Sequence, residues 1–510
     1  MNKTLTKRLR QRKQRIRHRL RKKQFQDRPD PMLSATNIHY DMADRVRGLA
    51  YGGIGAMHLL AWRTGLVAAI DGKLDLLKCH LPYHESDHIL NIAYNILCNG
   101  QCLEDIERLR NDEVYLDALG AERIPDPTTA GDFCRRFTEQ HVHTLMNIIN
   151  AIRLSVWGRQ PDAFFDEAII DADGTIAETT GECKEGMDIS YKGLWGYHPL
   201  LISLANTAEP LYLVNRRGNR TSSDGAAFYL DQAKDLCLTA GFRKILMRGD
   251  TDFSQTAHLD RWDADGVRFI FGINAMRNLE SIAENLPEGL WKPLIRPARY
   301  EVRTQPRQRP DNVKEQIVVE RRYKNIRLQS EHVAEFAYRP TKCHKTYRLV
   351  VVRKNLSVER GEEVLFDDVR YFFYITNDRV SSPAALVRLA NGRCNQENLI
   401  EQLKNGVQAM RMPVDNLVSN WAYMVMASLA WTLKAWFALM LPEQGRWSVR
   451  YKAEKDSVLT MEFKTFRHAF LLLPCQIVRT GRKVVYRLLG WNRWLSVLLR
   501  GWNVLRYSSG

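Results

Sequence analysis

Three short stretches of this 510-residue chain carry acidic side chains at places where proteins use them for chemistry. Asp171-Ala172-Asp173-Gly174-Thr175 ends an apolar stretch that predicts a β-strand, and Asp250 closely follows a second predicted strand. Glu397 lies on a helix predicted much later in the chain. Two divalent cations ~3.5–4 Å apart can clamp the attacking and leaving oxygens of a phosphate, and Mg²⁺ prefers carboxylate oxygens. Acidic side chains brought together from such distant segments therefore predict metal-dependent phosphoryl transfer.

The first acidic stretch leaves a choice between two aspartates. Residues two apart on a strand point to the same face, so strand geometry alone does not separate Asp171 from Asp173. Asp173 lies nearer the strand end, and the Gly and Thr that follow it allow another group to approach closely. We therefore predict Asp173 as the metal ligand and keep Asp171 as the alternative. An ordinary Asp-Gly turn is the competing interpretation of this stretch by itself.

The second acidic stretch runs Arg248-Gly249-Asp250-Thr251-Asp252-Phe253. Asp252 is expected to cap the amino end of a helix predicted at Gln255–Trp262, and that role accounts for it. Asp250 has no such role, and it follows a strand at the edge where α/β sheets present functional residues. We predict Asp250 as the second ligand, with a loop aspartate of no particular function as the alternative.

The third stretch places Glu397 between two cations on one helix face. Arg393 precedes Glu397 by four residues and Lys404 follows it by seven, so all three fall on one stripe. A carboxylate flanked by cations suits a metal ligand beside DNA phosphates, and we predict that Arg393 and Lys404 contact DNA. A salt-bridged amphipathic helix is the alternative.

The elements that must position these side chains follow from hydrophobic periodicity. Three strands are predicted in close succession, followed by alternating helices and strands, which is not a plain Rossmann repeat. This order is the one expected of an RNase H-like α/β sheet. The predicted strands are Ala163–Asp173, His198–Ala205, Leu211–Asn215, Lys244–Met247 and Val267–Ile273, and the predicted helices are Ala226–Leu238 and Gln255–Trp262.

Helical periodicity disappears between about residues 274 and 377, where we predict an inserted β domain. Its strands are expected at Tyr300–Thr304, Gln316–Arg322, Tyr347–Arg353 and Val369–Thr376. Ser382-Pro383 then predicts a helix start, and the helix carrying Glu397 is expected from about residue 393 to residue 408. The stretch Trp421–Leu441 is long enough to span a bilayer but contains Lys434, so we predict a buried core helix and no membrane contact.

The amino-terminal region is predicted to be helical and to bind DNA. Short helices at Glu104–Arg110, Glu113–Leu119 and Ala130–Phe137 are similar to a helix-turn-helix, with Arg135 and Arg136 as candidate DNA contacts. A solvated polar face is the alternative for each arginine. Ahead of this region, Leu5, Leu9, Ile16 and Leu20 share one sector of a helical wheel among many arginines, so the arm is expected to become helical on a phosphate backbone or an acidic surface.

The formal net charge of +17 is concentrated at the two ends of the chain. Residues 1–30 sum to +11 and residues 443–510 to +9, which leaves −3 for the remainder. Basic ends suit a polyanion, because each neutralised phosphate releases counterions. The nine cysteines include no C-x-x-C, which argues against a disulfide framework or a zinc ribbon. A charged amino terminus that lacks an apolar run argues against a signal peptide, so the cytoplasm is the expected location.

Together these motifs resemble group 1 of the DDE transposases of bacterial insertion sequences, and within it the insertion sequence 1380-like family, whose core is interrupted by a β-strand domain. The resemblance covers roughly residues 41–488 and rests on Asp171–Thr175, Arg248–Asp250, Arg393-x-x-x-Glu397 and Gly193–Leu200. It implies that Asp173, Asp250 and Glu397 are the catalytic triad and hold Mg²⁺, or Mn²⁺ in its place. Related enzymes often have a tyrosine three residues before the arginine, where this chain has Ala390.

The resemblance also implies an activity, partners and a location in the bacterial cytoplasm, in association with the nucleoid. The chain is expected to cut the ends of an insertion sequence and join them to target DNA, acting on double-stranded DNA as a homodimer. A metal-dependent nuclease without strand transfer and a non-catalytic DNA-binding derivative are the alternatives. The expected division is a basic arm at 1–40, a helical DNA-binding region at 41–160, the RNase H-like core at 161–274 and 379–442, a β insertion at 275–378 and a basic helical region at 443–510.

Overall fold

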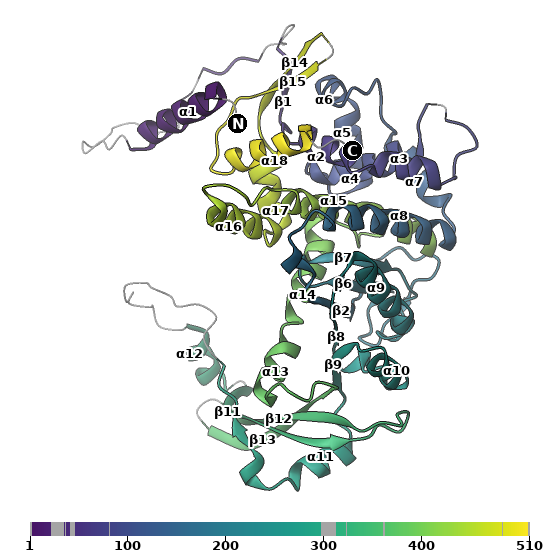
Figure 1. Cartoon of the computed structure of the whole chain (residues 1–510), viewed down its shortest axis with the longest axis vertical. Coiled ribbons are helices and arrows are strands. Elements are labelled where there is room, and N and C mark those ends of the chain that lie inside the picture. The colour runs from purple at the N-terminus through teal and green to yellow at the C-terminus, as the bar shows by residue number, and fades with distance from the viewer. Residues whose placement is uncertain are drawn as a thin grey trace.

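The computed structural model describes residues 3–21, 35, 37–40, 46–80, 82–296, 313–322, 324–360, 363–481 and 483–507. The chain is a mixed α/β protein built around one large mixed sheet of nine strands, which runs along the long axis of the molecule (Figure 1). In spatial order the strands are β7 (Glu209–Val214), β6 (Leu200–Leu204), β2 (Ala168–Gly174), β8 (Ile245–Gly249), β9 (Arg268–Ile273), β13 (Glu363–Thr376), β12 (Tyr347–Arg360), β11 (Lys324–Tyr338) and β10 (Lys292–Pro293).

The five strands predicted between residues 163 and 273 are all present and lie side by side. β2, β8 and β9 are parallel, whereas β6 is antiparallel to both β2 and β7. The first strand begins later than predicted, because Asp162–Phe165 forms a 3₁₀ turn. Helices α9 (Ala226–Ala240) and α10 (Leu259–Ala264) lie on one side of these strands, and α13 (Pro383–Asn391) and α14 (Cys394–Glu401) lie on the other (Figure 1).

The segment predicted as an inserted β domain extends this same sheet. β13 pairs antiparallel with β9 over Phe373–Thr376, and β12 and β11 continue outward from it. Two expectations for this segment are wrong, since α11 (Arg277–Glu284) and α12 (Val313–Glu320) are helices, and α12 covers most of the strand predicted at Gln316–Arg322. The strand predicted at Tyr300–Thr304 lies outside the described residues.

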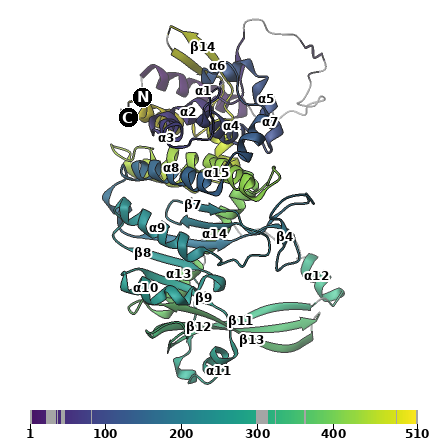
Figure 2. The same ribbon diagram turned by 90° about the vertical axis from the view of Figure 1, so that its right-hand side faces the viewer.

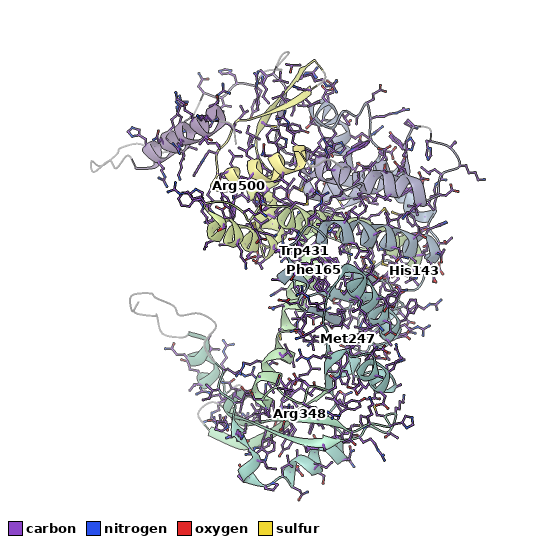
Figure 3. All side chains as sticks on the ribbon, in the orientation of Figure 1. His143, Phe165, Met247, Arg348, Trp431 and Arg500 are labelled. Atoms are coloured by element: carbon purple, nitrogen blue, oxygen red, sulfur yellow. The ribbon has the colours of Figure 1, made fainter. Side chains whose placement is uncertain are left out.

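The apolar stretch near residue 430 forms α15 (Leu417–Leu439), with the Asn416 side chain accepting the Ser419 N–H at its amino end. By length and composition α15 is the one described helix that could cross a membrane, yet its most apolar window is entirely buried inside the protein. It packs against β7 and against α4 (Glu85–Leu97), α8 (Glu139–Trp157) and α16 (Ser448–Leu459). The predicted core helix is therefore confirmed, and Figure 3 shows Trp431 of α15 between Arg500 and Met247 along the long axis.

The regions before and after the large sheet share one hydrophobic core with it, which extends from Leu49 to Leu505. The remaining amino-terminal helices are α1 (Lys3–Arg21), α2 (Ile54–Arg63), α3 (Leu66–Lys73), α5 (Ile106–Arg110), α6 (Glu113–Leu119) and α7 (Pro127–Arg135). The carboxyl-terminal elements after α16 are α17 (Phe463–Phe466), β14 (Cys475–Thr480), β15 (Lys483–Leu488) and α18 (Leu495–Tyr507). β14 pairs with both β15 and β1 (Gly48–Leu49) in one small sheet, and a second small sheet has the order β3 (Ala177–Glu178), β5 (Trp195–Tyr197) and β4 (Asp188–Ile189). All nine cysteines are free, as predicted.

Candidate active site

The register of two parallel strands brings the first two predicted ligands to one edge of the sheet. In the β2–β8 pair, Ala172 lies opposite Gly249, so the next residue of each strand, Asp173 and Asp250, lies at the same level. Neighbouring side chains at one level of a parallel pair point to the same face. Asp173 and Asp250, both predicted from their positions at strand ends, thus lie at the same edge of the sheet.

Asp171 and Asp173 have different partners. Both oxygens of Asp171 accept hydrogen bonds from Arg248, from Nε and Nη2, each at 2.7 Å. Asp171 is 1% exposed, and the third guanidinium nitrogen of Arg248 donates to the Leu389 carbonyl at the end of α13. A bidentate, buried pair of this kind leaves the Asp171 carboxylate committed to holding β2, β8 and α13 together.

Asp173 is the aspartate that faces other acids. Its Oδ2 accepts from Arg393 Nη1 at 3.0 Å, and the residue is 9% exposed. Burial raises the pKa of Asp173 to about 6, Arg393 opposes the rise, and the charges of Asp250 and Glu397 add to it. Asp250 and Glu397 are therefore both close enough to Asp173 to repel its charge, although they lie far from it in the sequence.

Asp250 is held at the amino end of a short 3₁₀ turn, where its Oδ1 accepts the Asp252 N–H at 3.0 Å. Burial is the main cause that raises the pKa of Asp250, and Arg393 opposes it. The predicted capping role of Asp252 is wrong, since α10 begins only at Leu259 and His258 precedes it without a side-chain cap. The backbone fold places Asp250, not Asp252, in the capping position.

A glycine that sequence reasoning missed lies under Asp250. A Cβ added to Gly272 of β9 would come within 2.8 Å of the Thr251 nitrogen and 3.0 Å of the Asp250 carbonyl carbon. Only a residue without a side chain allows the backbone after β8 to approach β9 so closely. A lone glycine in a predicted strand was the available signal, because such glycines mark close backbone approach.

Gln396 docks the helix that carries Glu397 onto the sheet, although no sequence pattern distinguishes it from the other polar residues of that helix. Its buried Nε2 donates to the Asp171 carbonyl at 3.0 Å, and it also lies within bonding distance of the Leu201 carbonyl and the Ser203 hydroxyl. These acceptors lie on β2 and β6, so Gln396 fixes the amino end of α14 above the strand that carries Asp173. Glu397 itself is exposed.

The two predicted basic positions around Glu397 both contact the segment that carries Asp173. Arg393 pairs with Asp173, as described above. The chain after α14 continues as a π-helical turn over Gln402–Gly406, and from it Lys404 Nζ donates to the Ile176 carbonyl at 2.7 Å. Burial lowers the pKa of Lys404. Both cations thus lie against the residues that end and follow β2.

His198, from the Gly193–Leu200 stretch, lies beside the same strand end. Its Nδ1 lies 2.7 Å from the Arg220 carbonyl, which can only accept, so Nδ1 carries the proton. A Cβ added to Gly174 would lie 3.1 Å from His198 Nε2. Gly174 therefore allows the imidazole ring to lie next to the residue that follows Asp173.

The acidic side chains suit a hard divalent cation by their chemistry. Their donors are all carboxylate oxygens. Burial is the main cause of the raised pKa of Asp173, and the charges of Asp250 and Glu397 add to it, so a bound cation would stabilise the ionised carboxylates. Within the described ranges, no group of three His, Cys, Asp or Glu side chains is close enough as it stands to hold a metal ion. In this arrangement Arg393 is the cation that neutralises Asp173.

The candidate DNA contacts of the amino-terminal region lie apart from this cluster in sequence and bind other residues. α6 has the predicted bounds, and α7 begins at Pro127 with Asp126 as its cap. Arg135 forms ion pairs with Asp132 at 2.8 Å and Asp415 at 3.0 Å. Arg136 directly follows α7 and is exposed. Whether either contacts DNA stays a prediction.

Comparison with known proteins identifies the family. The transposase DDE domain of group 1 matches residues 50–505. No curated protein matches the chain in sequence. A cryo-EM structure of the piggyBac transposase synaptic complex with hairpin DNA is similar over 82% of each chain, at 10% identity and a TM-score of 0.33, a likeness too distant to say what this chain binds. Because the family match covers most of the sequence, this chain belongs to the group 1 transposases with a DDE domain.

Proposed function

We propose that the chain cuts DNA at the ends of an insertion sequence and transfers those ends into target DNA, with Asp173, Asp250 and Glu397 as its catalytic acids. The observation that carries this proposal is the convergence of the three acids: Asp173 and Asp250 lie at one level of two adjacent parallel strands, and Asp250 and Glu397 both lie close enough to Asp173 for their charges to act on it. Carboxylates from two adjacent strand ends and a later helix thus share one electrostatic site. The family match over residues 50–505 supports the same reading.

Asp173, Asp250 and Glu397 would hold the divalent cation, Mg²⁺ or Mn²⁺. When bound, a pair of such ions activates a water or 3′-hydroxyl nucleophile and stabilises the leaving oxygen. Arg393, which now neutralises Asp173, would be released to a DNA phosphate once a cation takes its place. Lys404 would contribute a second cation near the same phosphate, and Asp171 would keep β2 and β8 in register through Arg248.

The strand order supports an RNase H-like core for the catalytic region. β7, β6, β2, β8 and β9 form a mixed sheet in which three successive strands precede the alternating helices and strands. We assign residues 275–378 as the β insertion between the second and third acids, and place the chain in the insertion sequence 1380-like family on its motifs. Action as a homodimer on two DNA ends, and a location at the bacterial nucleoid, follow from the same assignment.

The decisive experiment compares two neighbouring aspartates. Asp250→Asn should abolish Mg²⁺- or Mn²⁺-dependent cleavage of a plasmid carrying the inverted repeats that flank the gene, while binding to those repeats stays within about twofold. Asp252→Asn is the matched control, because Asp252 is exposed and gives only its backbone N–H to Asp250. Undiminished cleavage by the Asp250 variant would refute the assignment.

Two further outcomes separate the alternatives. Precut ends with a free 3′-hydroxyl, supplied with a target plasmid, should yield joined products in the presence of Mn²⁺. Cleavage without joining would favour a metal-dependent nuclease, and binding without either reaction would favour a non-catalytic derivative. Asp171→Asn, tested beside Asp173→Asn, would show which aspartate the chemistry requires.

A further inference from the structure

Two segments of the chain contain no acidic residue, and they lie at its opposite ends. Residues 1–26 and residues 463–510 have no Asp or Glu, although both contain many Lys and Arg residues. Acid-free segments of this length cannot neutralise their own charge through local ion pairs. Their positive charge must be balanced by ions in the solvent, by another part of the chain or by a negatively charged partner.

The fold brings these two ends together. Arg12 of α1 donates hydrogen bonds to the carbonyl of Leu488, the last residue of β15, and to that of Gly490, two residues beyond the strand. Lys13 Nζ lies 5.9 Å from the centre of the Trp491 ring, and Leu9 packs against the main hydrophobic core. Figures 1 and 2 both show α1 on the same end of the molecule as β14.

The two faces of α1 have different roles. Leu5, Leu9, Arg12, Lys13 and Ile16 are half-buried and follow helical spacing, so they form the docking face. Seven further cations of the helix are exposed, and none of the seven forms an ion pair with a described residue. They are Lys3, Lys7, Arg8, Arg10, Arg15, Arg17 and Arg19. With the exposed Lys483, Arg487 and Arg493 of the carboxyl-terminal end, they form what we call the basic platform.

We propose that the basic platform binds the phosphate backbone of duplex DNA without sequence preference and so captures target DNA. The helix is ~28 Å long, from a rise of ~1.5 Å per residue, so its seven exposed cations are spaced on average ~4 Å apart along the axis. Duplex DNA carries a negative charge per ~1.7 Å of axis, which such a row can match. Contacts of this kind position a protein on DNA and carry no sequence information. The assignment to target DNA rests on the proposed function, whereas duplex binding by the platform does not.

The test removes the exposed charges and keeps the docking face. One variant combines Lys3→Gln, Lys7→Gln, Arg8→Gln, Arg10→Gln, Arg15→Gln, Arg17→Gln and Arg19→Gln, since Gln retains helix propensity. The full-length protein is titrated against a fluorescent random-sequence duplex of 30 base pairs at several salt concentrations. Each lost phosphate contact lowers the slope of log Kd against log salt by ~0.9. A slope reduced by about 3–6, with affinity at least tenfold weaker at 0.15 M salt, is the expected result.

A matched control removes charge elsewhere. Lys244→Gln, Arg277→Gln and Lys292→Gln change exposed cations in and beside the large sheet, outside both basic ends and outside the predicted DNA-binding region, and they should leave the slope within about one unit. An unchanged slope and Kd in the platform variant would overturn the proposal, as would an equal loss in the control. Because the assay measures binding alone, its result is independent of whether Asp250 and its partners cut DNA.

Discussion

Two arginines give two neighbouring aspartates different roles. Arg248 occupies both oxygens of Asp171 in a buried pair, whereas Arg393 occupies one oxygen of Asp173 from a half-buried position. Strand periodicity could not choose between these aspartates, because both point to one side of β2. The choice depends on which partner each finds in the fold, and that information lies about 77 and 220 residues away in sequence.

Asp173→Asn should stabilise the metal-free protein at neutral and higher pH. The folded-state pKa of Asp173 is about 6, against ~3.9 in an unfolded chain. A raised carboxyl pKa contributes stability that is fully present below pH ~4 and is lost as the pH rises through 6, by roughly 3 kcal/mol. The Asn side chain cannot ionise, so the variant does not lose this stability as the pH rises. Thermal unfolding in EDTA should therefore show the variant more stable than wild type at pH 8 and about equal below pH ~4, and an equal difference at both pH values would contradict the assignment.

Gly272→Ala should disable cleavage by moving Asp250. The added methyl would lie 2.8 Å from the Thr251 nitrogen, so the backbone after β8 must shift away from β9. A misplacement of ~1 Å at a reacting group can cost ~100-fold in rate, and crowding of this kind costs ~1–3 kcal/mol of stability. Cleavage assays and melting curves would check both effects. Gly289→Ala is the control, since nothing lies within 4 Å of a Cβ there, and equal losses in the two variants would count against the positioning role.

Hydrophobic periodicity predicted the helices and strands that have a regular pattern. It failed for elements whose conformation depends on packing against the rest of the fold. The central strands and α9, α13 and α15 follow the hydrophobic pattern, and α6 has the predicted bounds. β11 was not predicted, because most of its side chains are exposed or half-buried on both faces and so do not alternate. The Ile-Val-Val run of Gln316–Arg322 favours a strand by composition, yet it forms α12. The β-propensity of three residues is readily overridden by the contacts that a segment makes in the fold.

The candidate site likewise contains residues that the sequence pattern could predict and residues that it could not. Asp173, Asp250 and Glu397 could be proposed from strand ends and a helical stripe, but the residues that hold their elements in place could not. Gln396 is one polar residue on an amphipathic helix, and nothing in its neighbours indicates that its amide binds two strands. Such contacts join segments that are distant in sequence, so they become visible only when the fold is known.

Gln396→Met should uncouple α14 from the sheet. Methionine has a similar length but no donor, so the contacts of Gln396 Nε2 with β2 and β6 are lost. The expected cost is ~1–3 kcal/mol of stability, with cleavage at least tenfold slower because Glu397 is no longer held over β2. Binding to the DNA ends should stay within about twofold. Asn398→Met, at an exposed position of the same helix, is the control, and a variant at Gln396 that cuts as fast as this control would disprove the positioning role.

At the scale of the molecule, one hydrophobic core joins regions that the sequence divides. α15 is central to it, since it contacts the sheet through β7 and is covered by α4, α8 and α16. The catalytic elements therefore depend on helices from before residue 161 and after residue 442. Dividing the chain at residues 161 and 442 follows the order of its motifs. An isolated fragment shows directly whether the segment between these positions folds by itself.

A fragment of residues 161–442 should not fold by itself. Without α4, α8 and α16, the buried surface of α15 would be exposed to water as a large apolar patch, which promotes aggregation. We expect an insoluble fragment, or a soluble one that binds an apolar dye and lacks a cooperative melting transition. A fragment of residues 46–507 should instead melt within ~2 °C of the full chain, because α1 is attached mainly through Leu9, Arg12 and Lys13. Cooperative unfolding of the shorter fragment would show that the sheet carries a sufficient core without the flanking helices.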